Sequence, residues 1–266
     1  IWIRIGPMSF QPAELSKVLL AVFFASYLVA NRDNLALAGR KVLWMSLPRA
    51  RHLGPLFIVW GVSICVLVLQ KDLGSSVLLF GLFVVVLYVA TDRPSWLLIG
   101  AALFLPAAWF AATHLHHVQQ RINGWLHATD NAVYNAAGGS WQLLTGMFGM
   151  STGGLMGAGW GKGSPTLVTF ANSDFIFASL GEELGLTGTL AILMLYLVLI
   201  QRGLRTAVSL RDGFGKLLAV GLSFAIALQI FVVIGGVTRL IPLTGLTLPF
   251  LAYGGSSLLA NWVILA

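Results

Sequence analysis

The sequence predicts an all-α, polytopic membrane protein, organised as a single transmembrane domain over residues 1–266. Of the 266 residues, 58% are hydrophobic and only 9% are charged. Soluble domains carry about 25% charged residues. The mean hydropathy is +0.87. This composition excludes an ordinary soluble domain.

Apolar runs of about the length of a bilayer crossing recur along the chain. A hydrocarbon core of ~30 Å needs roughly 20 helical residues. We therefore expect about seven transmembrane helices, at 11–30, 56–69, 73–90, 96–113, 175–200, 217–237 and from 256 onward. Because the last run is short and no signal-peptide pattern stands at the start, we expect a fragment of a longer protein.

Basic residues predict how the spans are oriented. They gather in two loops, and the positive-inside rule places both loops in the cytoplasm. Four spans separate the loops, which agrees with this placement. The large loop 114–174, the turn at 71–74 and the segment 246–257 are then extracytoplasmic. The net charge of +7 reports orientation and not nucleic-acid binding. The basic residues are Arg32, Arg40, Lys41, Arg49 and Arg51, and Arg202, Arg205, Arg211 and Lys216.

Three carboxylates stand where the large loop enters a hydrophobic helix. Asp174 could cap that helix, but a cap does not explain Glu182 and Glu183 further along the span. Ionisable groups at membrane depth are costly, so they indicate a functional site. In a regular helix only one of the two glutamates can share a cavity with Asp174.

Two further charged groups lie at the starts of spans. Pro12 and Glu14 suit a first helical turn, whereas Lys17 lies about one turn inside the span and needs a carboxylate, a cavity or a ligand phosphate. Asp72 either caps the following helix, with Lys71 as its counter-charge, or binds a ligand.

Glycine-rich and broken segments complete the candidate regions. Residues 153–159 either form a backbone nest for a diphosphate beside Lys162 or allow close helix packing. Segment 244–257 mixes helix breakers with Ser256 and Ser257, a pattern found at binding sites of transporters. His114, His116 and His117 do not have the spacing of a zinc site, and the lone Cys65 has no disulfide partner.

Together these segments resemble the SEDS family of polytopic proteins, which includes the RodA and FtsW types. Two departures from the family pattern are Val168-Thr169-Phe170, where Leu-Pro-Glu is common, and Ile1 in place of an arginine. The run 170–174 is more similar to actinobacterial RodA types than to FtsW types. The matching stretches are 10–17, 72–75, 153–159, 174–178 with 182–185, and 249–257.

The resemblance implies a ten-helix fold and a function in cell elongation. Family members polymerise lipid II into glycan strands outside the bacterial cytoplasmic membrane, together with a class B penicillin-binding protein. The family's essential aspartate corresponds to Asp174. The resemblance thus implies a glycosyltransferase, with lipid II as substrate and no nucleic acid as partner.

For this chemistry we expect Asp174 to deprotonate the acceptor hydroxyl. Lys17, Lys162, Arg121 or a divalent cation, Mg²⁺ or Mn²⁺, would neutralise the departing diphosphate. A flippase of a lipid-linked precursor and a scaffold for a partner are the alternative functions. The remaining substrate-binding candidates are Glu14, Asp72, Gln142, Glu182, Glu183, Ser256 and Ser257.

Overall fold

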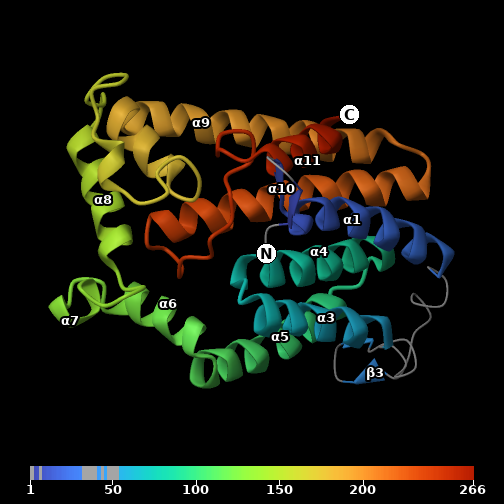
Figure 1. Ribbon diagram of the computed structural model, residues 1–266. Helices are drawn as coiled ribbons and strands as arrows, with labels where there is room; N and C mark the ends of the chain where they lie inside the picture. The colour runs from blue at the N-terminus through green and yellow to red at the C-terminus, as the bar shows by residue number, and fades with distance from the viewer. Residues whose placement is uncertain (1–2, 6–7, 32–40, 43–44, 47–53) are drawn as a thin grey trace. The chain divides into compact units, whose positions relative to one another are not determined.

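The computed structural model describes residues 3–5, 8–31, 41–42, 45–46 and 54–266. The protein is mainly helical (Figure 1), which confirms the predicted all-α class. Two small two-stranded sheets are added, formed by β1 (Ile3–Ile5) with β2 (Met8–Phe10) and by β3 (Lys41–Val42) with β4 (Met45–Ser46). The predicted cytoplasmic residues Arg32, Arg40, Arg49 and Arg51 lie outside the described residues.

Every predicted span contains a helix. Among the described residues, α4, α5, α9 and α10 are long and apolar enough to cross a membrane, so this is a multi-pass membrane protein. The helices are α1 (Pro12–Ala30), α3 (Gly54–Gln70), α4 (Leu73–Thr91), α5 (Ser95–His114), α6 (His116–Leu126), α7 (Asn131–Tyr134), α8 (Trp141–Gly153), α9 (Ile176–Ser209), α10 (Gly213–Val237) and α11 (Gly255–Leu265), with a short 3₁₀ turn η2 (Pro165–Leu167).

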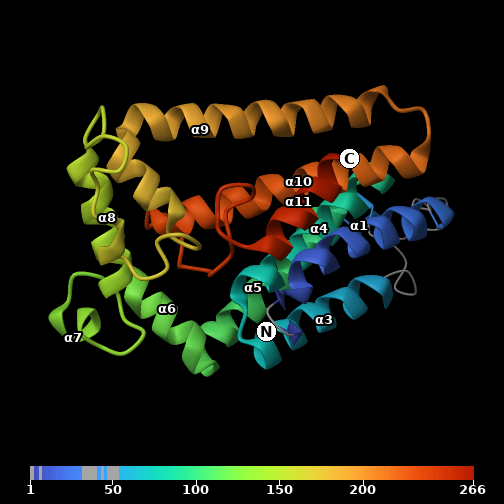
Figure 2. The same cartoon turned by 45° about the horizontal axis from the view of Figure 1, so that its top comes forward.

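The chain forms two compact units. The first comprises residues 1–3, 11–110 and 200–228, and the second comprises 4–10, 111–199 and 229–266. In the first unit α1 and α3 both pack on α4 (Figure 2). Its core includes Phe24 and Phe83, whose ring centroids are 4.8 Å apart. Gly100 of α5 meets the Val84 side chain, so small residues allow close helix approach, as in membrane bundles.

The start of α4 bears on the two roles predicted for Asp72, which were helix capping and ligand binding. Asp72 is the N-cap residue, because its Oδ1 accepts from the Ser75 amide at 3.0 Å and its Oδ2 accepts from the Ser75 hydroxyl at 2.6 Å. Both carboxylate oxygens are thus used inside the protein. The structure supports the capping role of Asp72.

We expect Asp72→Ala to lower the free energy of unfolding by about 1 kcal/mol, the usual cost of removing an N-cap. The thermal unfolding midpoint in detergent measures this change. Asp130→Ala is the control, since Asp130 is exposed and precedes α7 without a side-chain capping hydrogen bond. An equal loss of stability in both variants would contradict the capping role.

Helix α9 is broken near its beginning. Its 34 residues include Gly185, with φ 69° and ψ −169°, a conformation open almost only to glycine. A helix break leaves carbonyl groups before it and amide groups after it without intrahelical partners. These groups must be satisfied elsewhere, because lipid offers no hydrogen bonds.

The glycine-rich loop after α8 supplies those partners. The amides of Ala158 and Gly159 donate to the carbonyls of Glu182 and Glu183, at 2.9 and 3.0 Å. In return, the amides of Leu186 and Thr187 donate to the carbonyls of Gly154 and Leu155, at 2.9 and 3.1 Å. The loop therefore bridges the two halves of α9.

This bridge decides between the two interpretations of residues 153–159. A side chain on Gly157 would overlap the Glu183 carbonyl, and one on Gly153 would overlap the Gly181 carbonyl. Gly153 and Gly157 therefore serve close packing of loop and helix. The predicted diphosphate nest is wrong for the amides of Ala158 and Gly159, because α9 already binds them.

Candidate functional site

The candidate site is built around Asp174, in the turn that precedes α9. The turn is held in place by Phe175, which is 2% exposed and packs against Gly146 of α8. The Ser179 hydroxyl donates to the Ala171 carbonyl at 3.3 Å, and the Tyr253 amide donates to the Asn172 carbonyl at 2.7 Å. Asp174 is half-buried, and α9 begins only at Ile176. The fixed turn thus presents the carboxylate just before the helix.

A guanidinium group reaches the same place. A methyl group added at Gly245 would lie 3.5 Å from Arg121 Nη2 and 3.7 Å from Asp174 Oδ2. Arg121 Nη1 donates to the Leu243 carbonyl at 2.7 Å. Gly245 has φ 78°, in the left-handed region that glycine adopts without strain. A carboxylate and a cation therefore flank one glycine, although they come from segments far apart in sequence.

The segment that carries Gly245 is fastened to α6 on its other side. Arg239 donates from Nε to the Trp125 carbonyl at 2.8 Å and from Nη2 to the Leu126 carbonyl at 3.0 Å. The Trp125 indole donates back to the Arg239 carbonyl at 3.0 Å. Arginine thus satisfies carbonyls at the C-terminal end of α6. Arg239 was not predicted as a structural residue, because its only signal in the sequence is its position just after an apolar span.

We expect Arg239→Gln to lower the free energy of unfolding by about 1.5–3 kcal/mol, since hydrogen bonds that involve a charged group contribute this much. Thermal unfolding in detergent measures the loss. Arg205→Gln removes the same charge from an exposed position of α9 and should change the midpoint little. Equal midpoints for the two variants would show that the hydrogen bonds from Arg239 to α6 do not stabilise the protein.

Three of the predicted substrate-binding residues hold the loop between α8 and α9. Gln142 donates from Nε2 to the Thr169 carbonyl at 2.5 Å. Glu182 Oε1 accepts from the Ser164 amide at 2.8 Å, and the Glu183 side chain lies beside Gly163. These side chains therefore position the loop. Lys162 is exposed, and its methylene groups lie against Gly159.

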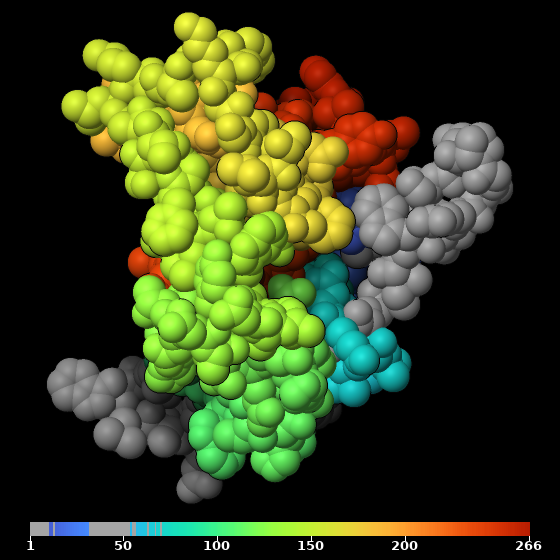
Figure 3. All heavy atoms as spheres, turned by 60° about the vertical axis from the view of Figure 1, so that its left-hand side comes forward, coloured from blue at the N-terminus to red at the C-terminus, as the bar shows by residue number. Residues whose placement is uncertain are grey.

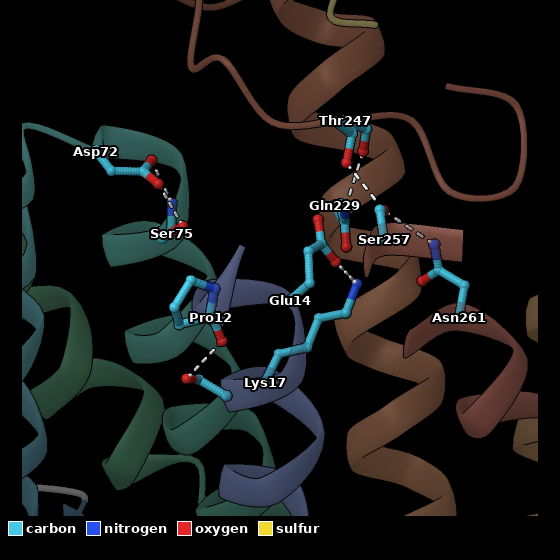
Figure 4. A network of polar contacts seen from close by, with 10 residues as sticks. Pro12, Glu14, Lys17, Asp72, Ser75, Gln229, Thr247, Ser257 and Asn261 are labelled. Carbon is cyan, nitrogen blue, oxygen red and sulfur yellow. Dashed lines mark hydrogen bonds and ion pairs between the residues drawn. The ribbon is translucent and has the colours of Figure 1, made fainter. Parts of the chain in front are cut away.

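Ser257 belongs to a buried polar network in the second unit (Figure 4). Gln229 of α10 donates from Nε2 to the Thr247 carbonyl at 2.8 Å, and the Thr247 and Ser257 hydroxyls are 3.0 Å apart. Asn261 Nδ2 donates to the Ser257 hydroxyl at 3.4 Å. Ser256 beside it is also buried. The network ties the irregular segment before α11 to α10 and α11.

Glu14 and Lys17 form a buried ion pair within α1 of the first unit. Lys17 Nζ lies 2.6 Å from Glu14 Oε2, and the two side chains are 1% and 5% exposed (Figure 4). The carboxylate that the sequence analysis required for Lys17 is thus one turn away. Removing one partner of such a pair leaves a buried charge uncompensated.

The predicted site residues belong to two different compact units. Asp174 and Arg121 come together at Gly245, and Gln142, Lys162, Glu182, Glu183, Ser256 and Ser257 belong to the same unit. Glu14, Lys17 and Asp72 belong to the first unit. Residues 111–174 of the second unit form part of the continuous green-to-yellow surface in Figure 3.

Comparison with known proteins identifies the family. A family model described as FTSW_RODA_SPOVE, cell cycle protein, matches residues 1–266. The chain belongs to the FtsW/RodA/SpoVE family. The predicted resemblance to RodA and FtsW types is therefore confirmed.

Within the FtsW/RodA/SpoVE family the chain is more similar to mycobacterial RodA proteins than to the FtsW proteins of Geobacter. It is 52% identical over 266 residues to the peptidoglycan glycosyltransferase RodA of Mycobacterium tuberculosis, covering 100% of this chain and 56% of that protein. It is 33% identical over 262 residues to a probable peptidoglycan glycosyltransferase FtsW of Geobacter metallireducens, covering 98% and 66%. The chain thus spans a little over half the length of the RodA relatives.

Solved structures of the family share the fold. A peptidoglycan synthase complex, described as coordinating polymerization and crosslinking, aligns with a TM-score of 0.75 and 25% identity, over 99% of this chain and 70% of that one. The rod shape determining protein RodA of Thermus thermophilus aligns with a TM-score of 0.61 and 25% identity, over 99% and 66%. These likenesses agree with the predicted polytopic helical fold.

Proposed function

We propose that the protein is a peptidoglycan glycosyltransferase that polymerises lipid II into glycan strands during cell elongation. The single observation that carries the proposal is the meeting of the Asp174 carboxylate and the Arg121 guanidinium at Gly245. Glycosyl transfer to a sugar hydroxyl needs a base for the proton and a cation for the leaving diphosphate. The names of the relatives support this activity.

Each group has one part in the proposed reaction. Asp174 takes the proton from the acceptor hydroxyl as its oxygen attacks the anomeric carbon of the donor sugar. The bond from that carbon to the diphosphate oxygen breaks, and its electron pair leaves with the lipid diphosphate. Arg121 balances the charge that develops there. Because attack and departure occur on opposite sides, the anomeric configuration is inverted.

We expect Arg121→Gln to lower kcat about 10²–10³-fold, the usual cost of removing one group that stabilises transition-state charge. Arg121→Lys should retain part of kcat, because a lysine keeps the charge but not the planar fork. Glycan chains formed from lipid II by the reconstituted protein give kcat and KM. An unchanged kcat in Arg121→Gln would remove Arg121 from the mechanism.

The reaction is proposed to take place at the outer face of the bacterial cytoplasmic membrane. The loop 114–174 would then face the extracytoplasmic side, where a class B penicillin-binding protein would crosslink the product. The likeness to a peptidoglycan synthase complex supports a partner of this kind. Cysteine labelling from outside intact cells at Asn131 tests the orientation.

We further propose that a divalent cation binds together with the substrate diphosphate near Asp174. Mg²⁺ is commonly held by one or two carboxylates together with substrate phosphates, and Asp174 offers one such carboxylate. Among the described residues no group of three or more His, Cys, Asp or Glu could hold an ion by itself. Mg²⁺ or Mn²⁺ would therefore arrive with the diphosphate, and chelation by EDTA would then slow polymerisation.

A further inference from the structure

The loop that bridges α9 also exposes a cluster of apolar side chains. We call residues 154–162 the bridging loop. Three of its side chains face outward, with Leu155 67%, Met156 81% and Trp160 76% exposed. Exposed apolar groups gathered on one short loop mark an interaction surface, whereas single exposed ones do not.

The position of the bridging loop along α9 indicates its depth in the bilayer. It is hydrogen-bonded to residues 182–187 of α9. From Leu186, the first residue after the break, to Arg202, where the apolar part of α9 ends, the helix rises about 24 Å at 1.5 Å per residue. This length crosses most of a hydrocarbon core of ~30 Å. The bridging loop therefore lies at one boundary of the core.

The backbone of the bridging loop is prepared for a non-aqueous environment. Irregular backbone is tolerated near lipid only where its polar groups are satisfied within the protein. Here the amides of Ala158 and Gly159 and the carbonyls of Gly154 and Leu155 are all paired with α9. The Gly157 amide donates to the Gly153 carbonyl at 2.7 Å. The apolar side chains of the loop can thus point into lipid while these backbone groups keep their hydrogen-bond partners.

The surface is continuous with side chains of α9 that also point outward. Leu186 and Leu190 of α9 are each 50% exposed, and Leu186 bonds directly to the loop. Tryptophan is enriched at the bilayer interface, and Trp160 would lie there. The ammonium of Lys162 suits the anionic phosphates of lipid headgroups. These features favour lipid over a protein partner.

We propose that the bridging loop is a lipid anchor, which inserts Leu155, Met156 and Trp160 into the interfacial layer of the bilayer at the end of α9. The anchor holds both halves of the broken helix, and with them the turn that carries Asp174, at a fixed depth. This inference rests on the loop itself and is independent of the proposed enzymatic activity.

Site-directed spin labelling tests the anchor. A nitroxide is attached at Met156→Cys in a Cys65→Ala background, in nanodiscs of phosphatidylethanolamine and phosphatidylglycerol. Oxygen concentrates in lipid and a nickel chelate in water, so the ratio of their collision rates reports depth. We expect this ratio to be several-fold higher at position 156 than at Asn131→Cys, an exposed polar position of α7.

Trp160→Cys provides a second label, and its ratio should also exceed that at position 131. Equal ratios at 131, 156 and 160 would overturn the proposal. Labels that are water-exposed in nanodiscs and become protected only when a partner protein is added would also overturn it, in favour of a protein-docking surface. Neither measurement depends on glycan synthesis.

Discussion

Asp174→Asn is expected to reduce lipid II polymerisation by about 10²–10⁴-fold, the contribution of a positioned general base. Asparagine keeps the size of the side chain and accepts a hydrogen bond, but it cannot take the proton of the acceptor hydroxyl. The turn is held by Phe175, Ala171 and Asn172 and not by the carboxylate alone, so folding should persist. Chain formation by the purified protein in liposomes measures the loss.

Asp130→Asn is the matched control, because Asp130 is exposed and its carboxylate lies 3.6 Å from Nδ1 of the exposed His127. It should polymerise lipid II at the rate of the unmodified protein. Thermal unfolding midpoints of the two variants should agree within about 1 °C, which corresponds to a few tenths of a kcal/mol. Full activity of Asp174→Asn would falsify its role as base.

The same variant separates the enzyme from the flippase alternative. If the protein moves a lipid-linked precursor across the bilayer without transferring sugars, Asp174→Asn need not affect scrambling in protein-loaded vesicles. Scrambling by the unmodified protein without any glycan product would favour the flippase. Glycan product that disappears in Asp174→Asn favours the transferase.

Gly185→Ala is expected to lower the free energy of unfolding by about 2–6 kcal/mol. The φ and ψ of Gly185 lie in a region essentially confined to glycine, which costs an alanine about 1–3 kcal/mol. Its Cβ would also overlap the Gly157 amide, and overpacking costs about 1–3 kcal/mol more. Because the obstacle is backbone, relief requires losing hydrogen bonds between the bridging loop and α9.

Gly255→Ala is the matched control for Gly185→Ala. A Cβ at Gly255 would meet nothing within 4 Å, and Gly255 begins α11. This variant should be neutral or slightly stabilising, since alanine reduces the conformational freedom of the unfolded chain. Thermal unfolding in detergent compares the two. Similar midpoints would show that the bridge across the break contributes little to stability.

The sequence predicted the fold class and the spans because these depend on local composition. Each predicted apolar run became a helix, since a run of this length can satisfy its backbone in lipid only by helix formation. Asp174 also stood out in the sequence, because a carboxylate beside a hydrophobic span is costly wherever the rest of the chain lies.

The break in α9 was not predictable in the same way. Gly181, Gly185 and Gly188 all lie in one helical stretch, and single glycines are tolerated within helices. Only the docked bridging loop distinguishes Gly185, because it supplies the hydrogen bonds that the break leaves open. For the same reason the amides of Ala158 and Gly159 are not available for a diphosphate nest, one of the two alternatives predicted for residues 153–159.

The sequence by itself determined a polytopic helical protein with a carboxylate at the entry of a span, because spacing and hydropathy act over short stretches. The tertiary structure alone decided which cation accompanies that carboxylate. Arg121 and its acceptor Leu243 are 122 positions apart, and Arg239 reaches back to Trp125 over 114 positions. Contacts over such sequence separations depend on the tertiary fold, whereas hydropathy and residue spacing describe only neighbouring residues.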